Sequence, residues 1–251
     1  MHDLPTDMKL TPKISVGLVA YNGVEHIRCA LDSIARQSYK NLELIVVDGD
    51  STDGTKDILK EYADHISVLI SEPDNGIYDA MNKVCLHSTG DWLIFLGCDD
   101  ELLDTLGSVA KFMTNPDAVY YGDVIFRSSG NYYGGKFSKF RLMEQNICHH
   151  ALFYPRAIYR RYFYSLNYPW LADYAYNLNL MGLGIEFVYS GVVVSIYNDK
   201  GGSSSGDADF NRDKARLLLA AFGPAYAMAW VARRYMISIK LLFLHLLPRR
   251  R

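Results

Sequence analysis

The chain has 251 residues, 49% hydrophobic and 22% charged, with a formal net charge of −2 at pH 7, which indicates a globular protein with one large domain or two small ones. Its four cysteines, Cys29, Cys85, Cys98 and Cys148, form no CxxC pair, which argues against a disulfide framework and a cysteine-built zinc site. The first residues contain acids and no apolar run, so we expect no secretory signal and a reducing cytosol as the location.

Short apolar runs alternate with helical patterns from residue 14 to residue 96. They predict strands at Ile14–Val19, Leu42–Val47, Ser67–Ile70 and Trp92–Leu96, and helices at Glu25–Arg36, Thr55–Tyr62 and Ile77–Ser88. Asn22 is the expected cap of the first helix. The alternation predicts a mostly parallel α/β sheet with right-handed crossovers and a ligand crevice at the carboxyl ends of its strands.

Two adjacent carboxylates, Asp99 and Asp100, follow the apolar run Trp92–Leu96 directly. Placing them together costs repulsion, which a hard divalent cation with bound phosphate would relieve, because Mg²⁺ and Mn²⁺ prefer oxygen ligands. The plainer interpretation is an exposed acidic turn after a core strand. The pair alone favours the turn, and the rest of the chain favours the cation.

The pattern changes after Asn115 into shorter, aromatic-rich segments. Aromatic side chains supply flat contact area for a sugar, but a tyrosine-rich core would have the same composition. Composition does not decide between these two interpretations.

The C-terminal segment is basic and apolar. From Lys214 onward there are eight Lys or Arg and no Asp or Glu, which leaves −10 for residues 1–213 against the total of −2. Its apolar runs are shorter than the ~20 residues that cross a bilayer, and Gly223–Pro224 interrupts the first. We expect a helix at an anionic inner membrane surface, with packing on the core as the alternative. The acidic core argues against nucleic acid as a partner.

Five motifs in a fixed order carry a family resemblance: ISVGLVAYN, ELIVVDGDSTDGT, SEPDNGIYDAMNK, GDWLIFLGCDDE and LADYAYNLNLMG, followed by GGS. Together they resemble the family 2 glycosyltransferases, most closely bacterial enzymes of exopolysaccharide, colanic-acid-like or lipopolysaccharide assembly. The resemblance implies a GT-A fold, a nucleotide-diphosphate sugar donor, Mg²⁺ or Mn²⁺, inversion at the anomeric carbon, and a glycan or lipid-linked acceptor. Together with the basic apolar C-terminal segment, the motif order favours a cytoplasmic enzyme that is peripheral on the inner face of the cell membrane.

The resemblance divides the chain into four parts. These are a tail at residues 1–13, a nucleotide-sugar-binding half at 14–115, an acceptor-binding half at 116–212 and a basic apolar helical region at 213–251.

The resemblance also implies the residues that hold the donor. Val19 ends the first predicted strand and Tyr21 follows it, and the resemblance places both at the nucleotide. Tyr21 either stacks on the base or is an aromatic residue at the rim of the site. Asp48 or Asp50 accepts a hydrogen bond from the base. Asp79 holds donor-sugar hydroxyls, or else it is a surface acid paired with Lys83 four residues on.

The resemblance implies roles in metal binding and catalysis for three acids. By analogy Asp99 contacts ribose or the donor sugar, and Asp100 ligates the metal ion. An inverting transfer needs a base to remove the acceptor hydroxyl proton, and Asp173, at the start of a helix, matches the family's acid. Stabilisation of that helix start is the alternative role for Asp173.

The last implied contacts lie in two later segments. His149 in ICHHALF lines the acceptor or diphosphate side, whereas His150 departs from the family pattern. Lys200 contacts phosphate, and the following Gly201–Ser203 form a loop that closes over the donor.

Two other classes of function share part of this sequence pattern. A nicotinamide-dependent oxidoreductase would have the alternating strands, but the first strand continues into AYNG without a G-x-G-x-x-G motif. A non-catalytic sugar-binding or membrane-binding module would have no need of Asp99, Asp100 and Asp173.

Overall fold

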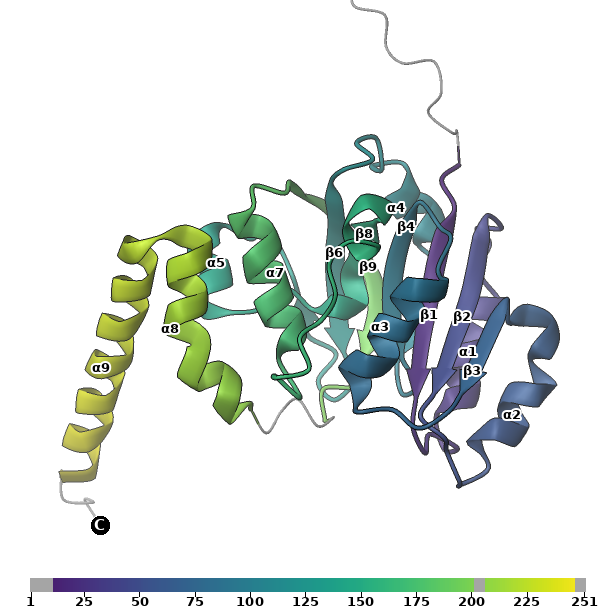
Figure 1. Ribbon diagram of the computed structural model, residues 1–251, viewed down its shortest axis with the longest axis horizontal. Coiled ribbons are helices and arrows are strands. Elements are labelled where there is room, and N and C mark those ends of the chain that lie inside the picture. Colours follow the sequence, from purple (N-terminus) through teal and green to yellow (C-terminus); the bar gives the residue numbers. More distant parts are fainter. Residues whose placement is uncertain (1–10, 201–205, 247–251) are drawn as a thin grey trace, which may run out of the picture.

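A mixed β-sheet with helices on both faces forms the body of the molecule (Figure 1). The computed structural model describes residues 11–200 and 206–246, with side chains as far as residue 237. The first half contains β1 (Ile14–Ala20), α1 (Ile27–Ala35), β2 (Leu42–Asp48), α2 (Thr55–Glu61), η1 (Ala63–His65), β3 (Val68–Ser71), α3 (Ile77–His87), β4 (Trp92–Gly97), β5 (Glu101–Leu102) and α4 (Leu106–Ala110). The second half contains β6 (Val119–Phe126), β7 (Tyr132–Tyr133), α5 (Lys139–Glu144), η2 (His149–Ala151), β8 (Leu152–Pro155), α6 (Arg156–Tyr159), α7 (Ala172–Gly182), β9 (Phe187–Tyr197), α8 (Ala208–Phe222) and α9 (Pro224–Leu246).

The described strands pair in the order β3-β2-β1-β4-β8-β6-β9-β5, with β7 paired to β6. The first four are parallel, and Ile14 of β1 stands between Leu42 of β2 and Trp92 of β4. All seven residues of β1 are buried, as expected for a parallel strand covered on both faces. The predicted parallel α/β unit is therefore confirmed, and its strand and helix ends lie within one or two residues of the predicted ones.

Alternate residues of the parallel strands enter two separate cores. Val19, Val47 and Phe95 pack with α3 and α7 on one face, and Leu18 and Val46 pack with α1 and α4 on the other. This is the two-residue alternation of a β-strand. Helix α1 buries five of its nine residues, as expected for a helix that covers one face of a sheet.

The β1–α1 loop differs from the prediction at Asn22. Helix α1 begins at Ile27 after His26, and no side chain caps it. Asn22 adopts a positive φ of 49°, and its side chain accepts a hydrogen bond from the Thr52 backbone NH at 2.9 Å. An asparagine tolerates this backbone conformation, so Asn22 ties the β1–α1 loop to the β2–α2 loop instead of starting a helix.

Most aromatics of the second half belong to the core. Tyr120, Tyr121, Tyr154 and Tyr159 are fully buried. The tyrosine-rich core is thus the correct interpretation for these four residues, whereas Trp170 is exposed.

Helices α8 and α9 form a hairpin that packs against α7 and α5, at the end of the molecule opposite α2 (Figure 1). Trp230 of α9 packs on the core, and Lys214 of α8 is buried with its ammonium 4.4 Å from the Tyr174 ring centre. Burial lowers the pKa of Lys214 to about 8. Within the described residues, no helix is both long and apolar enough to cross a membrane.

Candidate active site

A cavity of about 680 Å³ opens at the carboxyl ends of the parallel strands. Its walls come from the ends of β1, β2 and β4, the segment between β3 and α3, and Trp170. The lining residues include Val19, Tyr21, Gly49, Asp50, Asp74, Gly76, Cys98, Asp99 and Trp170. A volume of this size fits a cofactor-sized ligand, at the position where open α/β sheets bind ligands.

Asp48 lies buried next to this cavity, and Asp50 lies in its wall. Asp48 is fully buried, and its Oδ2 accepts hydrogen bonds from the Ser51 NH at 3.1 Å and the Ser71 hydroxyl at 2.7 Å. Its Oδ1 is buried without a partner in the described part of the chain. Asp50 is exposed, has a positive φ of 65° and pairs with Lys56.

Two exposed aromatic side chains line the cavity. Tyr21 is 66% exposed at the end of β1, and Trp170 is 41% exposed just before α7. The sequence analysis predicted Tyr21 as a site residue but missed Trp170. The only feature of the sequence that could have indicated Trp170 is its position three residues before Asp173. Asp74 was also missed. It lies within reach of Gly49, where a Cβ would stand 2.6 Å from Asp74 Oδ2.

The acid pair lies at the end of β4, with its two carboxylates close together. A Cβ on Gly97 would stand 2.6 Å from Asp100 Oδ2 and 3.0 Å from Asp99 Oδ1, so a larger residue there would displace these carboxylates. Asn198, at the end of β9, donates from its backbone NH to Asp100 Oδ1 at 2.7 Å and from its amide to Asp99 Oδ2 at 2.8 Å. Asn198 was not predicted.

The two acids differ in environment. Asp99 lines the cavity, whereas Asp100 is 2% exposed and forms an ion pair with His150 Nε2 at 2.9 Å. Burial alone would lower the pKa of His150, but the charge and hydrogen bond of Asp100 raise it well above its usual value. Burial would raise the pKa of Asp100, and His150 holds it below the usual value instead. His150, which departs from the family pattern, thus neutralises Asp100 inside the protein.

The donor set at the pair suits a hard cation. Carboxylate oxygens of both acids converge at Gly97, and a carboxylate has about four lone-pair sites, of which Asp100 uses three. No group of three or more His, Cys, Asp or Glu in the described ranges could hold a metal ion unaided. Mg²⁺ commonly uses one or two carboxylates together with substrate phosphates, so the residues fit a cation bound with a diphosphate.

Cys98 does not extend this donor set. Burial, followed by the charge of Asp99, raises the pKa of Cys98 to about 12. The neutral thiol is a poor metal ligand, because metals bind the thiolate.

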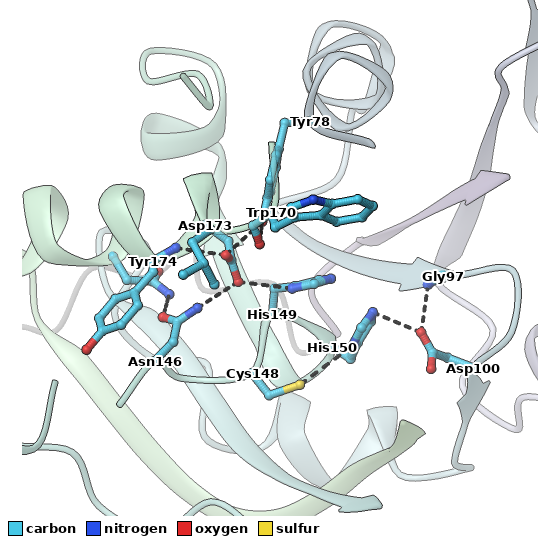
Figure 2. A network of polar contacts seen from close by, with 12 residues as sticks. Tyr78, Gly97, Asp100, Asn146, Cys148, His149, His150, Trp170, Asp173 and Tyr174 are labelled. Atoms are coloured by element: carbon cyan, nitrogen blue, oxygen red, sulfur yellow. Dashed lines mark hydrogen bonds and ion pairs between the residues drawn. The ribbon is translucent and has the colours of Figure 1, made fainter. Parts of the chain in front are cut away.

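Asp173 is the centre of a second polar network, shown in Figure 2. It is 4% exposed in the first turn of α7. Its Oδ1 accepts from the Tyr78 hydroxyl and the Tyr174 NH, both at 2.8 Å, and its Oδ2 accepts from the Asn146 amide at 2.7 Å and lies 3.1 Å from His149 Nδ1. Burial would raise the pKa of Asp173, but the His149 hydrogen bond and the other donors hold it below its usual value.

The two networks meet at η2. The rings of His149 and His150 lie 3.9 Å apart, centre to centre. Because His149 contacts Asp173 and His150 contacts Asp100, these two adjacent histidines connect the two acids. Neither Tyr78 nor Asn146 was predicted, because residues 95 and 27 positions from Asp173 in sequence leave no local signal.

Two other predicted residues, Asp79 and Lys200, are not among the residues that line the cavity. Asp79 accepts hydrogen bonds from Asn75 at the start of α3 and lies 4.0 Å from Lys83 Nζ, as the surface interpretation expected. Lys200 is exposed, and its backbone NH donates to the Asn198 side chain at 3.3 Å. Gly201–Ser203 lie outside the described residues.

Comparison with solved structures identifies the fold. The TarS 1–349 structure of S. aureus in complex with UDP has a TM-score of 0.68 over 88% of this chain and 70% of that chain, at 19% identity. The mannosyltransferase PcManGT from Pyrobaculum calidifontis, solved with GDP-Man and Mn²⁺, has a TM-score of 0.62 over 89% and 66%, at 22% identity. The chain covers 42% of a longer TarS chain. These similarities show a GT-A type of fold.

Sequence comparison identifies the family. The glycosyl transferase family 2 model matches residues 15–172. A PGL/p-HBAD biosynthesis glycosyltransferase of Mycobacterium bovis is 40% identical over 204 residues, which are 77% of this chain and 80% of that protein. The putative teichuronic acid biosynthesis glycosyltransferase TuaG of Bacillus subtilis is 37% identical over 41% of this chain and 42% of its own length. The chain belongs to glycosyl transferase family 2.

It is therefore a glycosyltransferase that uses a nucleotide-sugar donor, and the predicted family and fold are confirmed. Membership of this family excludes the nicotinamide-dependent oxidoreductase as the leading function.

Proposed function

We propose that the enzyme transfers one sugar, with inversion, from a nucleotide-diphosphate sugar to a glycan or lipid-linked acceptor in bacterial surface polysaccharide assembly. One observation carries the proposal: a cavity is lined by the ends of β1 and β4 and by Trp170, with Asp99 in its wall and the Asp173 network joined to Trp170 through Tyr78. The relatives' names, which mention PGL/p-HBAD and teichuronic acid biosynthesis, support the acceptor class.

The nucleotide lies, in this proposal, between β1 and β2. Tyr21 offers an exposed ring for the base, with Val19 beside it. The unpaired, buried Oδ1 of Asp48 supports a hydrogen bond from a base NH, because an unpaired buried polar atom costs about 1–3 kcal/mol. Asp50 is the alternative partner, and Asp79 and Lys200 remain predictions for the sugar and phosphate.

Asp100 would hold Mg²⁺ or Mn²⁺ together with the diphosphate, and Asp99 beside it would contact ribose or the donor sugar. The bound cation would offset the negative charge that develops on the leaving diphosphate. Asn198 orients both carboxylates, and His150 keeps Asp100 ionised. The Asp173 network removes the acceptor proton on the opposite side of the sugar.

A nucleotide-sugar binding experiment tests the donor. We expect one of the UDP-, GDP- or dTDP-sugars to raise the melting temperature by about 5–10 °C at about 100 times Kd, and EDTA to abolish most of that shift. Differential scanning fluorimetry measures it, with the exposed helix acid variant Asp57→Asn as the control. Equal melting temperatures with every donor would contradict the proposal, and an unchanged shift in EDTA would contradict the cation.

We also propose that α9 places the enzyme at the anionic inner face of the cell membrane. Its apolar side chains Met228, Val231, Tyr235, Met236 and Ile237 are exposed, whereas Trp230 packs on the core. Arg233 pairs with Glu144 at 3.1 Å, so part of the basic charge is used within the protein. Exposed apolar area and basic charge on one helix favour an anionic interface.

Vesicle sedimentation tests this membrane attachment. We expect binding to vesicles that contain phosphatidylglycerol, weaker binding to phosphatidylcholine alone, and several-fold loss in Met236→Glu, because a charge opposes burial in the interface. Leu86→Glu, an exposed apolar position on α3, is the matched control. Equal sedimentation of Met236→Glu and the unmodified enzyme would refute the role of α9.

A further inference from the structure

The side chains that line the cavity offer a ligand many hydrogen-bond acceptors and few donors. Three of them are the carboxylates of Asp50, Asp74 and Asp99, and Asp48 lies buried next to the wall. The lining residues that the structure describes include no Lys, Arg, His, Asn or Gln, and an ionised carboxylate only accepts hydrogen bonds. A ligand must therefore supply most of the hydrogens itself.

Two of these acids, Asp48 and Asp74, lie next to Gly49 at the end of β2. Asp48 precedes Gly49 in the chain, and its buried Oδ1 has no partner in the described part of the chain. A Cβ on Gly49 would stand 2.6 Å from Asp74 Oδ2 and 3.2 Å from Cδ2 of Tyr21. Asp74 Oδ1 accepts from the Gly76 backbone NH at 2.9 Å, and no described residue donates to its Oδ2. Two open carboxylate oxygens thus lie near the exposed Tyr21 ring.

Helix α3 holds the loop that carries Asp74. Asp79 Oδ2 accepts hydrogen bonds from the Asn75 backbone NH at 3.0 Å and from the Asn75 amide at 3.3 Å. Lys83 Nζ donates to the Pro73 carbonyl oxygen at 3.1 Å. Both chain neighbours of Asp74 are therefore tied to α3. A group that is already held in place loses little conformational freedom on binding, so its hydrogen bonds contribute more to affinity.

Guanine is the common nucleobase that matches two neighbouring acceptors. It carries adjacent donors, the ring N1–H and the 2-amino group, whereas uracil and thymine have a single ring N–H with a carbonyl oxygen on each side. Adenine has an amino group beside a ring nitrogen that only accepts. With any base except guanine, one of the two carboxylates would face an acceptor and stay without a partner, and a site built around a hydrogen bond rejects ligands that lack it.

We propose that the donor nucleotide is GDP, with guanine N1–H donating to Asp48 Oδ1 and the guanine 2-amino group donating to Asp74 Oδ2. This inference rests on the proposed sugar transfer and names the base of its donor. Asp74 is the residue that determines base specificity. Asp79 and Lys83 are positioning residues that act through the loop between β3 and α3.

Calorimetric titration with free nucleoside diphosphates and Mg²⁺ tests the proposal. GDP should bind at least about 10²-fold more tightly than UDP or dTDP, and about tenfold more tightly than inosine diphosphate, which lacks only the 2-amino group. In Asp74→Asn the amide oxygen can keep the Gly76 NH while an NH₂ group replaces Oδ2. This variant should bind GDP and inosine diphosphate equally, and UDP more tightly than the unmodified enzyme does. Asp64→Asn, an exposed acid in η1, is the matched control and should keep the tenfold difference.

The outcomes separate this inference from the proposed function. If the unmodified enzyme binds none of these nucleotides and no nucleotide sugar, the proposed transfer fails. If UDP or dTDP binds more tightly than GDP, the transfer stands and guanine is wrong. Equal Kd values for GDP and inosine diphosphate would show that Asp74 does not contact the 2-amino group. That comparison uses the unmodified enzyme alone, and melting curves identify any misfolding of Asp74→Asn.

Discussion

Asp173→Asn is expected to lower kcat about 10⁴-fold while the nucleotide sugar still binds with a similar Kd. The introduced amide would donate to His149 Nδ1 instead of accepting from it, so the ring hydrogen would move to Nε2 and the lone pair would face the amide. The neutral amide also cannot take the proton of the acceptor hydroxyl. Loss of the charged acceptor should also lower the free energy of unfolding by about 1–3 kcal/mol, because Tyr78 and Asn146 lose part of their partner.

The measurement is single-turnover transfer, supported by ¹⁵N NMR of the His149 tautomer. Asp209→Asn, another acid in the first turn of a helix, controls for helix-start stabilisation. Because His149 and Asp173 act as one unit, the double variant should be no slower than the slower single variant. Full transfer activity in Asp173→Asn would refute any catalytic role of this network, and multiplied losses in the double variant would refute the shared unit.

The parallel half of the fold was predictable because burial on both faces leaves a simple pattern. Apolar runs such as those of β1 and β4 are bounded by turn residues, and parallel strands bring their carboxyl ends to one edge. The positions of Tyr21, Asp50 and Asp99 in the cavity wall follow from that geometry. These residues could be found from the sequence because each directly follows its strand.

The polar networks were not predictable in the same way. Asn198 reaches Asp100 from 98 residues away, and Tyr78 reaches Asp173 from 95 residues away, so only the folded chain brings them together. The pairing of His150 with Asp100 was missed for the same reason. The sequence could name candidate acids, but the structure was needed to distinguish the cavity-lining Asp99 from the buried, paired Asp100.

Asp99 and Asp100 differ in burial and pairing, so their substitution should lower the free energy of unfolding by different amounts. Asp100→Ala should lower the free energy of unfolding by about 3–5 kcal/mol, because it leaves the buried His150 charge without its partner. The backbone NH groups of Gly97 and Asn198 would also lose their acceptor. Asp99→Ala removes one hydrogen bond from Asn198 in a partly exposed position, and about 1 kcal/mol is expected there.

Urea denaturation without added metal or donor measures both values, so that ligand binding does not contribute. Both variants should lose the EDTA-sensitive nucleotide-sugar shift. The double variant Asp100→Asn with His150→Gln should recover part of the stability that Asp100→Ala loses, because a neutral amide pair replaces the broken ion pair. If Asp100→Ala unfolds at the same urea concentration as Asp99→Ala, the ion pair between Asp100 and His150 does not stabilise the protein as described.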